Sequence, residues 1–184
     1  MPCLRYSCAD TQGKTSDQVS RGVAQMSKGR RDKVVVLGVG NELLRDEGIG
    51  VHVARKLAGQ TFTFPVEIIE AGTVPDCWQG DEPVGKLVVI DAVYGGSEPG
   101  AIYRFCPEDV EFETCLMTSI HQLSFVDSLK LSEITGVKPE KTVIIGIEPK
   151  EVAWGMELSD ELRGRISDVI KIVLQEVTPD QGTG

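Results

Sequence analysis

The sequence lacks any apolar run near the roughly 18 residues that a membrane-spanning helix needs, and residues 1–30 lack the apolar segment of a secretory signal. It also lacks a CxxC pair, although it contains five cysteines: Cys3, Cys8, Cys77, Cys106 and Cys115. An odd number of cysteines without that spacing fits neither a disulfide framework nor a structural zinc site. We therefore expect a soluble protein that stays in the reducing cytoplasm and has no membrane partner.

Positive charge is scarce as well. The chain has 19 lysines and arginines against 28 aspartates and glutamates, which gives a net charge of -9 and a pI of about 4.8. Nucleic-acid binding depends on lysines and arginines that neutralise phosphates, so this balance argues against a nucleic-acid partner. The one basic cluster, in residues 28–33, is short, and we interpret it as a solvated flank.

Histidines are few. The chain has only His52 and His121, and it has no G-x-S-x-G motif, so nothing matches a serine or cysteine nucleophile arrangement. His52 lies five residues after Glu47, a poor spacing for sharing a helix face, and we expect it to be partly exposed and without a role. For Trp78 and Trp154 we expect a packing role.

The length of 184 residues fits a single domain. Residues 1–32 are polar with little hydrophobic pattern, and we predict that they form a disordered leader. One hypothesis is that translation starts at Met26, just ahead of the first predicted strand. The predicted folded domain spans residues 33–178, and residues 179–184 are expected to form a flexible tail.

Continuous apolar runs alternate with helical patterns along this domain. Because a strand exposed on one face would alternate apolar and polar residues, such runs predict strands buried on both faces. We expect an α/β fold with a mainly parallel, five-stranded sheet sandwiched between helices. The short fourth strand has a composition that also suits an antiparallel edge strand, and the sequence leaves its direction open. The predicted strands are residues 34–37, 65–69, 86–91, 101–105 and 142–147; the predicted helices are residues 49–57, a segment from about 121 to 135, and residues 160–177, with Ser159 as N-cap.

Polar residues follow the predicted strands at one edge of the sheet. The stretch VVVLGVGNELLRDEGIG, residues 34–50, delivers Asp46 and Glu47 at the carboxyl end of the first strand, where open α/β sheets bind ligands. Asp91 ends the third strand, and His121 opens the helix after the fourth. Two carboxylates and one imidazole suit a divalent ion such as nickel, zinc, manganese or iron and leave positions open for water or substrate. We predict Glu47, Asp91 and His121 as the site, with Asp46 as a helix-capping neighbour.

The same turn is also open to a dinucleotide interpretation. Gly38 and Gly40 match the first two glycines of GxGxxG, but Leu43 occupies the third position. The turn also carries two acids where phosphates favour positive potential. A dinucleotide-binding oxidoreductase is therefore a disfavoured alternative.

The segment GVGNELLRDEGIG, residues 38–50, resembles the opening motif of the hydrogenase maturation peptidases, which process the large subunit of nickel-iron hydrogenases. Three further blocks occur in the order found in that family: EAGT at residues 70–73, VIDA at 89–92 and HQL at 121–123. The resemblance extends over about residues 33–177.

The resemblance implies a twisted, mainly parallel sheet and an endopeptidase that removes the C-terminal extension of the hydrogenase large-subunit precursor once nickel has been inserted. The metal ligands of the family correspond to Glu47, Asp91 and His121, the residues already selected by position. Glu70 occupies a place where the family often has an aspartate, so we treat it as an accessory residue. Nickel is expected to be presented by the precursor, and other divalent ions can occupy the site.

The remaining physical route to peptide cleavage is metal-assisted, with Glu47 or Asp91 serving both as ligand and as proton acceptor. The roles of Glu47, Asp91 and His121 in catalysis and in metal binding are not separable from the sequence. The main alternative is a metal-sensing chaperone of the same precursor that binds through these residues without cleaving. We expect a monomer.

Overall fold

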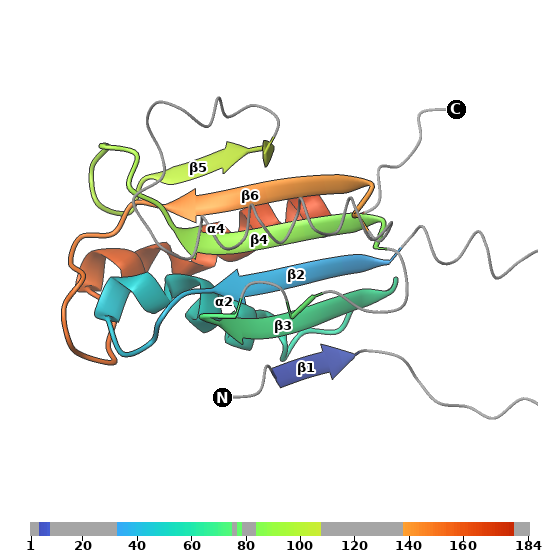
Figure 1. The fold of residues 1–184 in the computed structure, drawn as a ribbon, viewed down its shortest axis with the longest axis horizontal. Helices are drawn as coiled ribbons and strands as arrows, with labels where there is room; N and C mark the ends of the chain where they lie inside the picture. Colours follow the sequence, from blue (N-terminus) through green and yellow to red (C-terminus); the bar gives the residue numbers. More distant parts are fainter. Residues whose placement is uncertain (1–3, 8–32, 75–76, 79–83, 108–137, 179–184) are drawn as a thin grey trace, which may run out of the picture.

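The computed structural model describes residues 4–7, 33–74, 77–78, 84–107 and 138–178. It places a sheet against two α-helices, with a short 3-10 helix between the first long strand and the first α-helix (Figure 1). The elements, in chain order, are β1 (Leu4–Ser7), β2 (Val34–Val39), η1 (Arg45–Gly48), α2 (Ile49–Leu57), β3 (Val66–Gly72), β4 (Lys86–Ala92), β5 (Ile102–Phe105), β6 (Lys141–Ile147) and α4 (Asp160–Val177).

The sheet has the strand order β1-β3-β2-β4-β6-β5. Strands β3, β2, β4 and β6 are parallel to one another, while β1 and β5 pair antiparallel with the strands beside them, β3 and β6. The mainly parallel α/β sheet predicted from the sequence is confirmed, and all five predicted strands are present. The strand whose direction the sequence left open, β5, is an antiparallel edge strand.

The sheet gains a sixth strand that the sequence did not reveal. Residues 4–7 fall within the segment predicted to be a disordered leader, yet they form β1, with Leu4 opposite Glu70 and Ser7 opposite Glu67. The prediction of disorder is wrong for these four residues. An edge strand needs only the exposed backbone hydrogen-bonding groups of its neighbour, so its own sequence can carry little apolar pattern.

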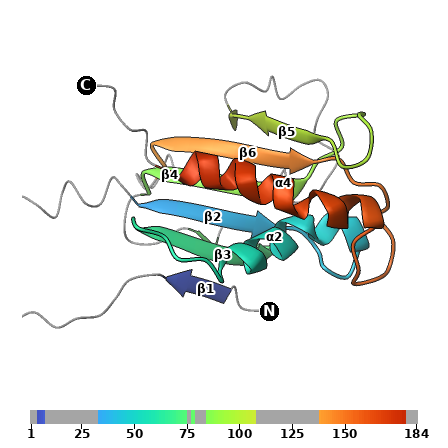
Figure 2. The ribbon, with the colours of Figure 1, turned by 180° about the vertical axis from the view of Figure 1, so that it is seen from behind.

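Side chains alternate between two apolar layers on the two faces of the sheet. Val34 and Val36 of β2 lie in the layer shared with α2 and α4, whereas Val35 and Leu37 lie in the layer that contains Trp78. Figures 1 and 2 show α2 and α4 together on one face of the sheet. The helix predicted to start near His121 lies outside the described residues.

The last helix, α4, follows its predicted pattern closely. The Ser159 hydroxyl accepts a hydrogen bond from the Leu162 backbone N–H at 3.4 Å, as expected of an N-cap, and Asp160 and Glu161 occupy the first turn. Its buried residues form a single stripe against the sheet: Leu162, Ile166, Val169, Val173 and Val177. Neither this helix nor any other helix within the described ranges is both long and apolar enough to cross a membrane.

Candidate active site

The predicted carboxylates lie at the switch point of the sheet. From β2 the chain crosses to β3 on one side, and β4 then pairs with β2 on the other side. Ligands of open α/β sheets bind at the carboxyl ends of the strands at such a point. Glu47 follows β2 in η1, and Asp91 is the second-last residue of β4, so both residues stand at this edge.

Close backbone packing fixes the position of Glu47. A Cβ atom at Gly40, whose φ is +134°, would lie 1.9 Å from the Glu47 carbonyl oxygen. A Cβ atom at Gly50 would lie 2.2 Å from the carbonyl oxygens of both Val39 and Ile90. The glycines of this turn therefore let α2 and η1 sit directly on the ends of β2 and β4. Close backbone packing thus explains why glycines are needed here, and no bound phosphate has to be invoked. This weighs further against the dinucleotide interpretation.

Asp91 is buried, with 5% of its surface exposed. Its Oδ1 atom accepts a hydrogen bond from the Ala92 backbone N–H at 2.8 Å. Burial raises the pKa of Asp91 to about 7, and the nearby negative charge of Glu47 adds to the rise, while the Ala92 hydrogen bond opposes it. The Oε2 atom of Glu47 is itself buried. Two carboxylates that share a desolvated edge favour a proton or a cation between them.

The third predicted ligand, His121, lies outside the described residues, and its position stays a prediction. Within the part of the chain that the structure describes, no three histidine, cysteine, aspartate or glutamate side chains come together closely enough to hold a metal ion. The two carboxylates that it does bring together supply hard oxygen ligands of the kind that suit divalent ions. Glu47 and Asp91 thus fit the predicted donor set, and the set needs a further ligand from elsewhere.

Asp46 does not cap a helix, contrary to the prediction. Neither η1 nor α2 has a side-chain cap. Asp46 is fully buried, and its carboxylate accepts hydrogen bonds from three distant backbone N–H groups, those of Lys150 at 3.0 Å, Glu151 at 2.9 Å and Ser159 at 2.7 Å. It therefore ties the segment between β6 and α4 to the loop that carries Glu47. Its partners are more than 100 residues away in the sequence, so local spacing could not reveal them.

Glu70, the predicted accessory residue, is held by an arginine. Its Oε2 atom accepts hydrogen bonds from Arg55 Nε at 3.1 Å and Nη2 at 2.7 Å. Arg55 also donates two hydrogen bonds to Glu42, and these bonds, followed by those to Glu70, raise the pKa of Arg55 above its usual value. The Oε1 atom of Glu70 is buried without a hydrogen-bond partner among the described residues. Glu70 is thus anchored to α2 through Arg55.

His52 is partly buried, as expected. Burial is the main cause that lowers its pKa; the negative charge of Glu42 and, to a smaller extent, a hydrogen bond to the backbone of Met156 oppose this effect. The ring therefore contacts the segment between β6 and α4, the same segment that Asp46 holds.

Sequence reasoning missed Glu148, which directly follows β6. It is 6% exposed and accepts hydrogen bonds from the Gly95 N–H at 2.7 Å, the Ser97 N–H at 3.3 Å and the Tyr103 hydroxyl. These bonds fix the loop after β4, which carries Tyr94. Partial burial raises the pKa of Tyr94, which is 40% exposed, and the charge of Glu47 adds to the rise. An acid directly after an apolar strand, the signal that identified Asp91, would also have identified Glu148.

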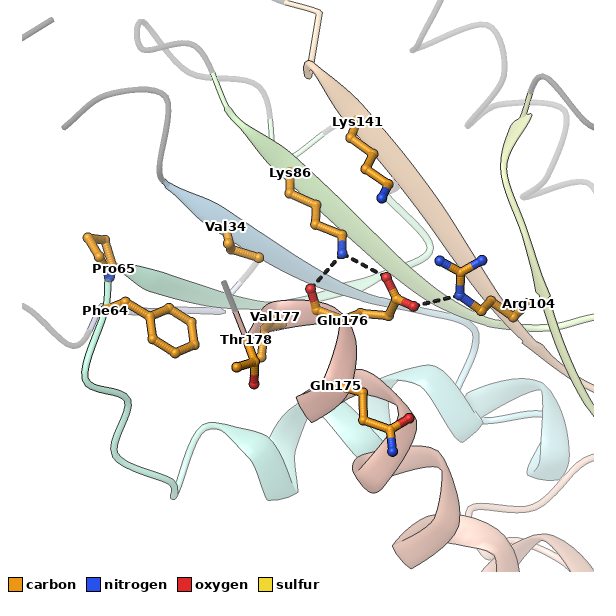
Figure 3. Close-up of a pocket in the computed structure, with 10 residues that line it drawn as sticks. All are labelled: Val34, Phe64, Pro65, Lys86, Arg104, Lys141, Gln175, Glu176, Val177 and Thr178. Atoms are coloured by element: carbon orange, nitrogen blue, oxygen red, sulfur yellow. Dashed lines mark hydrogen bonds and ion pairs between the residues drawn. The ribbon is translucent and has the colours of Figure 1, made fainter. Parts of the chain in front are cut away.

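A cavity of about 580 Å³ lies at the opposite edge of the sheet (Figure 3). It is lined by residues at the amino ends of the strands, such as Val34 and Lys86, and by the last turn of α4. The Lys86 amino group donates hydrogen bonds to the Glu176 backbone oxygen at 2.6 Å and carboxylate at 2.7 Å, and Arg104 Nε donates to the same carboxylate at 2.5 Å. The Glu176 carboxylate is thus already paired, and the cavity lies far from the switch point where the site is expected.

The fold and the site together define an α/β protein with two carboxylates, Glu47 and the buried Asp91, at the switch point of a mainly parallel sheet. A sequence model described as hydrogenase maturation protease matches residues 51–176. The chain is 32% identical to the hydrogenase 2 maturation protease of Escherichia coli over 146 residues, covering 77% of this chain and 88% of that protein. It is 30% identical to the hydrogenase expression/formation protein HoxM of Azotobacter vinelandii over 151 residues, covering 77% and 70% of the two chains.

Solved structures give the same result. The hydrogenase maturating endopeptidase HybD from Escherichia coli has a TM-score of 0.68 and 28% identity, covering 79% of this chain and 91% of that one. The [NiFe] hydrogenase maturation protease HybD from Thermococcus kodakarensis has a TM-score of 0.66 and 29% identity, covering 79% and 99%. The chain belongs to the hydrogenase maturation protease family, which confirms the resemblance of its motifs.

Proposed function

We propose that this protein is an endopeptidase that removes the C-terminal extension of a nickel-iron hydrogenase large-subunit precursor after nickel insertion. Membership of the hydrogenase maturation protease family supports proteolysis, and its relatives include maturation proteases of hydrogenase 2 and of a [NiFe] hydrogenase. The observation that supports particular residues as the active site is the burial of Asp91 near Glu47 at the switch point of the sheet.

Glu47, Asp91 and His121 are the residues that would hold the nickel, which arrives as part of the precursor. The burial of Asp91 supports this assignment, because a desolvated carboxylate beside a second negative charge is stabilised by a cation. Nickel bound there would polarise the scissile carbonyl or lower the pKa of a bound water. Other divalent ions share the same ligand preference and can occupy the site.

Asp91 also suits a role in proton transfer. Its pKa of about 7 lets it exist both with and without a proton near neutral pH, the range in which a general base is most effective. Its Oδ1 atom is engaged by the Ala92 N–H, which leaves Oδ2 for a ligand or a proton. Glu47, in the 3-10 helix η1, lies at the same end of the sheet and would be a second carboxylate ligand of the metal.

The test uses nickel-loaded and nickel-free precursor, each incubated with the protein and then weighed by mass spectrometry. Peptidase activity predicts that the large subunit loses a C-terminal fragment only when nickel is present. Glu47→Gln, Asp91→Asn and His121→Ala should each abolish the loss, while Asp168→Asn, which neutralises an exposed carboxylate on α4, should leave it unchanged. A fully active variant with all three substitutions would place the site elsewhere.

The same experiment separates the second candidate, a metal-sensing chaperone. A chaperone would bind nickel-loaded precursor through the same residues, and the mass of the large subunit would not change. Binding measured by co-elution in size-exclusion chromatography, with no shortening after long incubation, would favour the chaperone.

We further propose that the protein acts in the cytoplasm as a monomer, with no membrane or nucleic-acid partner. The net charge of -9 supports the last part, because phosphates repel an acidic surface. Light scattering coupled to size-exclusion chromatography tests the monomer, for which the expected mass is 20.0 kDa. A mass of twice that value at micromolar concentration would contradict it.

A further inference from the structure

Four large apolar side chains lie exposed on two neighbouring loops, the one that leads into η1 and the one that leads into α4. Trp154 is 82% exposed, Met156 65%, Leu43 51% and Val152 41%. We call these four residues the Trp154 surface. The sequence predicted a packing role for both tryptophans. Trp78, which is 3% exposed, is packed as predicted, whereas the prediction is wrong for the exposed Trp154. A tryptophan side chain can bury on the order of 200 Å² on contact, so such exposure is unusual unless a partner covers it.

The backbone beneath the Trp154 surface is firmly held. Leu44 and Gly155 form a parallel bridge, in which the Gly155 N–H donates to the Leu43 carbonyl at 3.0 Å and the Arg45 N–H donates to the Gly155 carbonyl at 2.9 Å. The buried carboxylate of Asp46 holds both ends of the second loop. The apolar side chains therefore project from a backbone fixed by hydrogen bonds, which lowers the entropy lost when a partner binds.

The Trp154 surface borders the candidate site. Leu43 lies four residues before Glu47, in the loop that leads into η1, and Asp46, which precedes Glu47, accepts the hydrogen bonds that fix the second loop. On the other side, His52 of α2 bonds the backbone of Met156. The backbone links between the two loops therefore place this surface next to the segment that carries Glu47.

Charges surround the apolar residues and pair with one another. Arg45 pairs with Glu151 at 3.4 Å, and Lys150 pairs with Glu161. An apolar centre with a polar rim is the usual composition of a protein interface, and exposed tryptophan is among the residues most often dominant in binding. Because these rim charges are internally compensated, the surface favours an apolar peptide segment over a highly charged partner.

We propose that the Trp154 surface docks an apolar segment of the large-subunit precursor adjacent to the peptide bond to be cleaved. This inference rests on the proposed function. A second copy of the chain is a poorer occupant, because a copy seated here would also cover the approach to Glu47 and Asp91.

The first test is kinetic. Trp154→Ala and Met156→Ser, combined in one variant, should raise the KM for nickel-loaded precursor by about tenfold or more and leave kcat within about twofold, since the surface binds without touching the reacting atoms. Trp154→Phe should retain most of the affinity. Lys171→Ala, which truncates an equally long exposed side chain on α4, should match the unchanged protein. An unchanged KM in the double variant would overturn the proposal.

The second test follows Trp154 directly by fluorescence. In a Trp78→Phe background only Trp154 remains, and its emission should shift to shorter wavelength when nickel-loaded precursor is added, because the indole leaves water. Adding Glu47→Gln keeps the precursor uncleaved during the measurement. No shift at saturating precursor would overturn the proposal, as would an equal shift produced by raising the enzyme concentration alone.

The two proposals fail differently. If the unaltered protein never shortens the precursor but the Trp154 emission still shifts, the surface docks the precursor and the endopeptidase assignment fails. If processing depends on nickel and on Glu47 while the double variant keeps its KM, the endopeptidase assignment holds and the docking surface is wrong.

Discussion

At the scale of single residues, neighbouring hydrogen-bond donors separate structural carboxylates from chemical ones. Asp46 and Asp91 are both buried aspartates at the carboxyl ends of adjacent strands. Within the described residues, Asp46 accepts three backbone hydrogen bonds, whereas Asp91 accepts one, from Ala92. Burial raises the pKa of Asp91, the acid with fewer donors, to about 7, so its carboxyl is available for a proton or a cation.

Replacing Asp46 should destabilise the fold. Asp46→Ala leaves the buried N–H of Ser159 and those of Lys150 and Glu151 without their acceptor, at a cost of about 3 to 5 kcal/mol in the free energy of unfolding. Asp46→Asn keeps an oxygen acceptor and should cost less. Urea unfolding followed by circular dichroism measures both. A loss below about 1 kcal/mol for the alanine variant would mean that water replaces the carboxylate.

Replacing Asp91 should have the opposite effect on stability. The pKa of Asp91 is about 7 in the folded protein against an ordinary 3.8, so its contribution to stability is fully present below about pH 4 and is lost as the pH rises through 7. In chelator-treated protein, Asp91→Asn should therefore be more stable than the unaltered chain at pH 8, by about 1 to 3 kcal/mol, with the difference vanishing near pH 4. Thermal unfolding at several pH values measures this. A less stable variant at pH 8 would show that the carboxylate is paired.

At the scale of elements, the sequence predicted what local pattern determines. Continuous apolar runs identified the central strands, and Ser159 with its apolar stripe identified α4. Features that depend on contacts between distant parts of the chain could not be predicted in this way. They are β1, which pairs with β3, and the hydrogen-bond partners of Asp46. The prediction for Trp154 failed for a related reason, because the sequence does not reveal which aromatic side chain the fold leaves exposed. In the candidate site, the positions of Glu47 and Asp91 at the carboxyl ends of the strands were predictable, whereas their role as ligands and the place of His121 stay predictions.

The end of α4 offers a prediction on acid stability. Burial alone would raise the pKa of Glu176, but hydrogen bonds from Arg104 and Lys86 outweigh it and lower the pKa to about 2. Since this lies below the ordinary 4.5, the stabilisation is present above about pH 4.5 and is lost as the pH falls toward 2. Glu176→Gln should thus lower the free energy of unfolding at pH 7 by about 1 to 2 kcal/mol. This range is small because solvent screens the ion pair with Arg104, which is half exposed.

The check on Glu176 is a pair of urea unfolding series at pH 7 and pH 2.5. The variant and the unaltered chain should differ at pH 7 and approach one another at the lower pH. Glu161→Gln, which removes an exposed carboxylate at the other end of α4, serves as the control. Equal stability of the Glu176 variant at pH 7 would show that the three-way pairing contributes nothing.

At the scale of the whole molecule, the two ends of the sheet differ in kind. The amino ends of the strands are closed by the Lys86–Glu176–Arg104 pairing beside the cavity (Figure 3). The carboxyl ends carry the two site carboxylates and, beside them, the Trp154 surface. Among the described residues, the charged groups at the amino ends thus pair with one another, while the carboxyl ends combine buried carboxylates with exposed apolar side chains. We therefore expect the substrate at the carboxyl ends.

This polarity predicts where the precursor protects the backbone. Hydrogen exchange of the Glu47→Gln variant, followed by mass spectrometry with and without nickel-loaded precursor, should slow in residues 41–47 and 150–159. It should stay unchanged in residues 84–87 and 174–178 at the amino ends of the strands. The slowing should be lost in the Trp154→Ala, Met156→Ser variant at precursor concentrations near the KM of the unaltered protein, because the surface then holds the precursor too weakly. Protection centred on residues 84–87 and 174–178 would instead place the substrate at the cavity and reverse the assignment of the two ends.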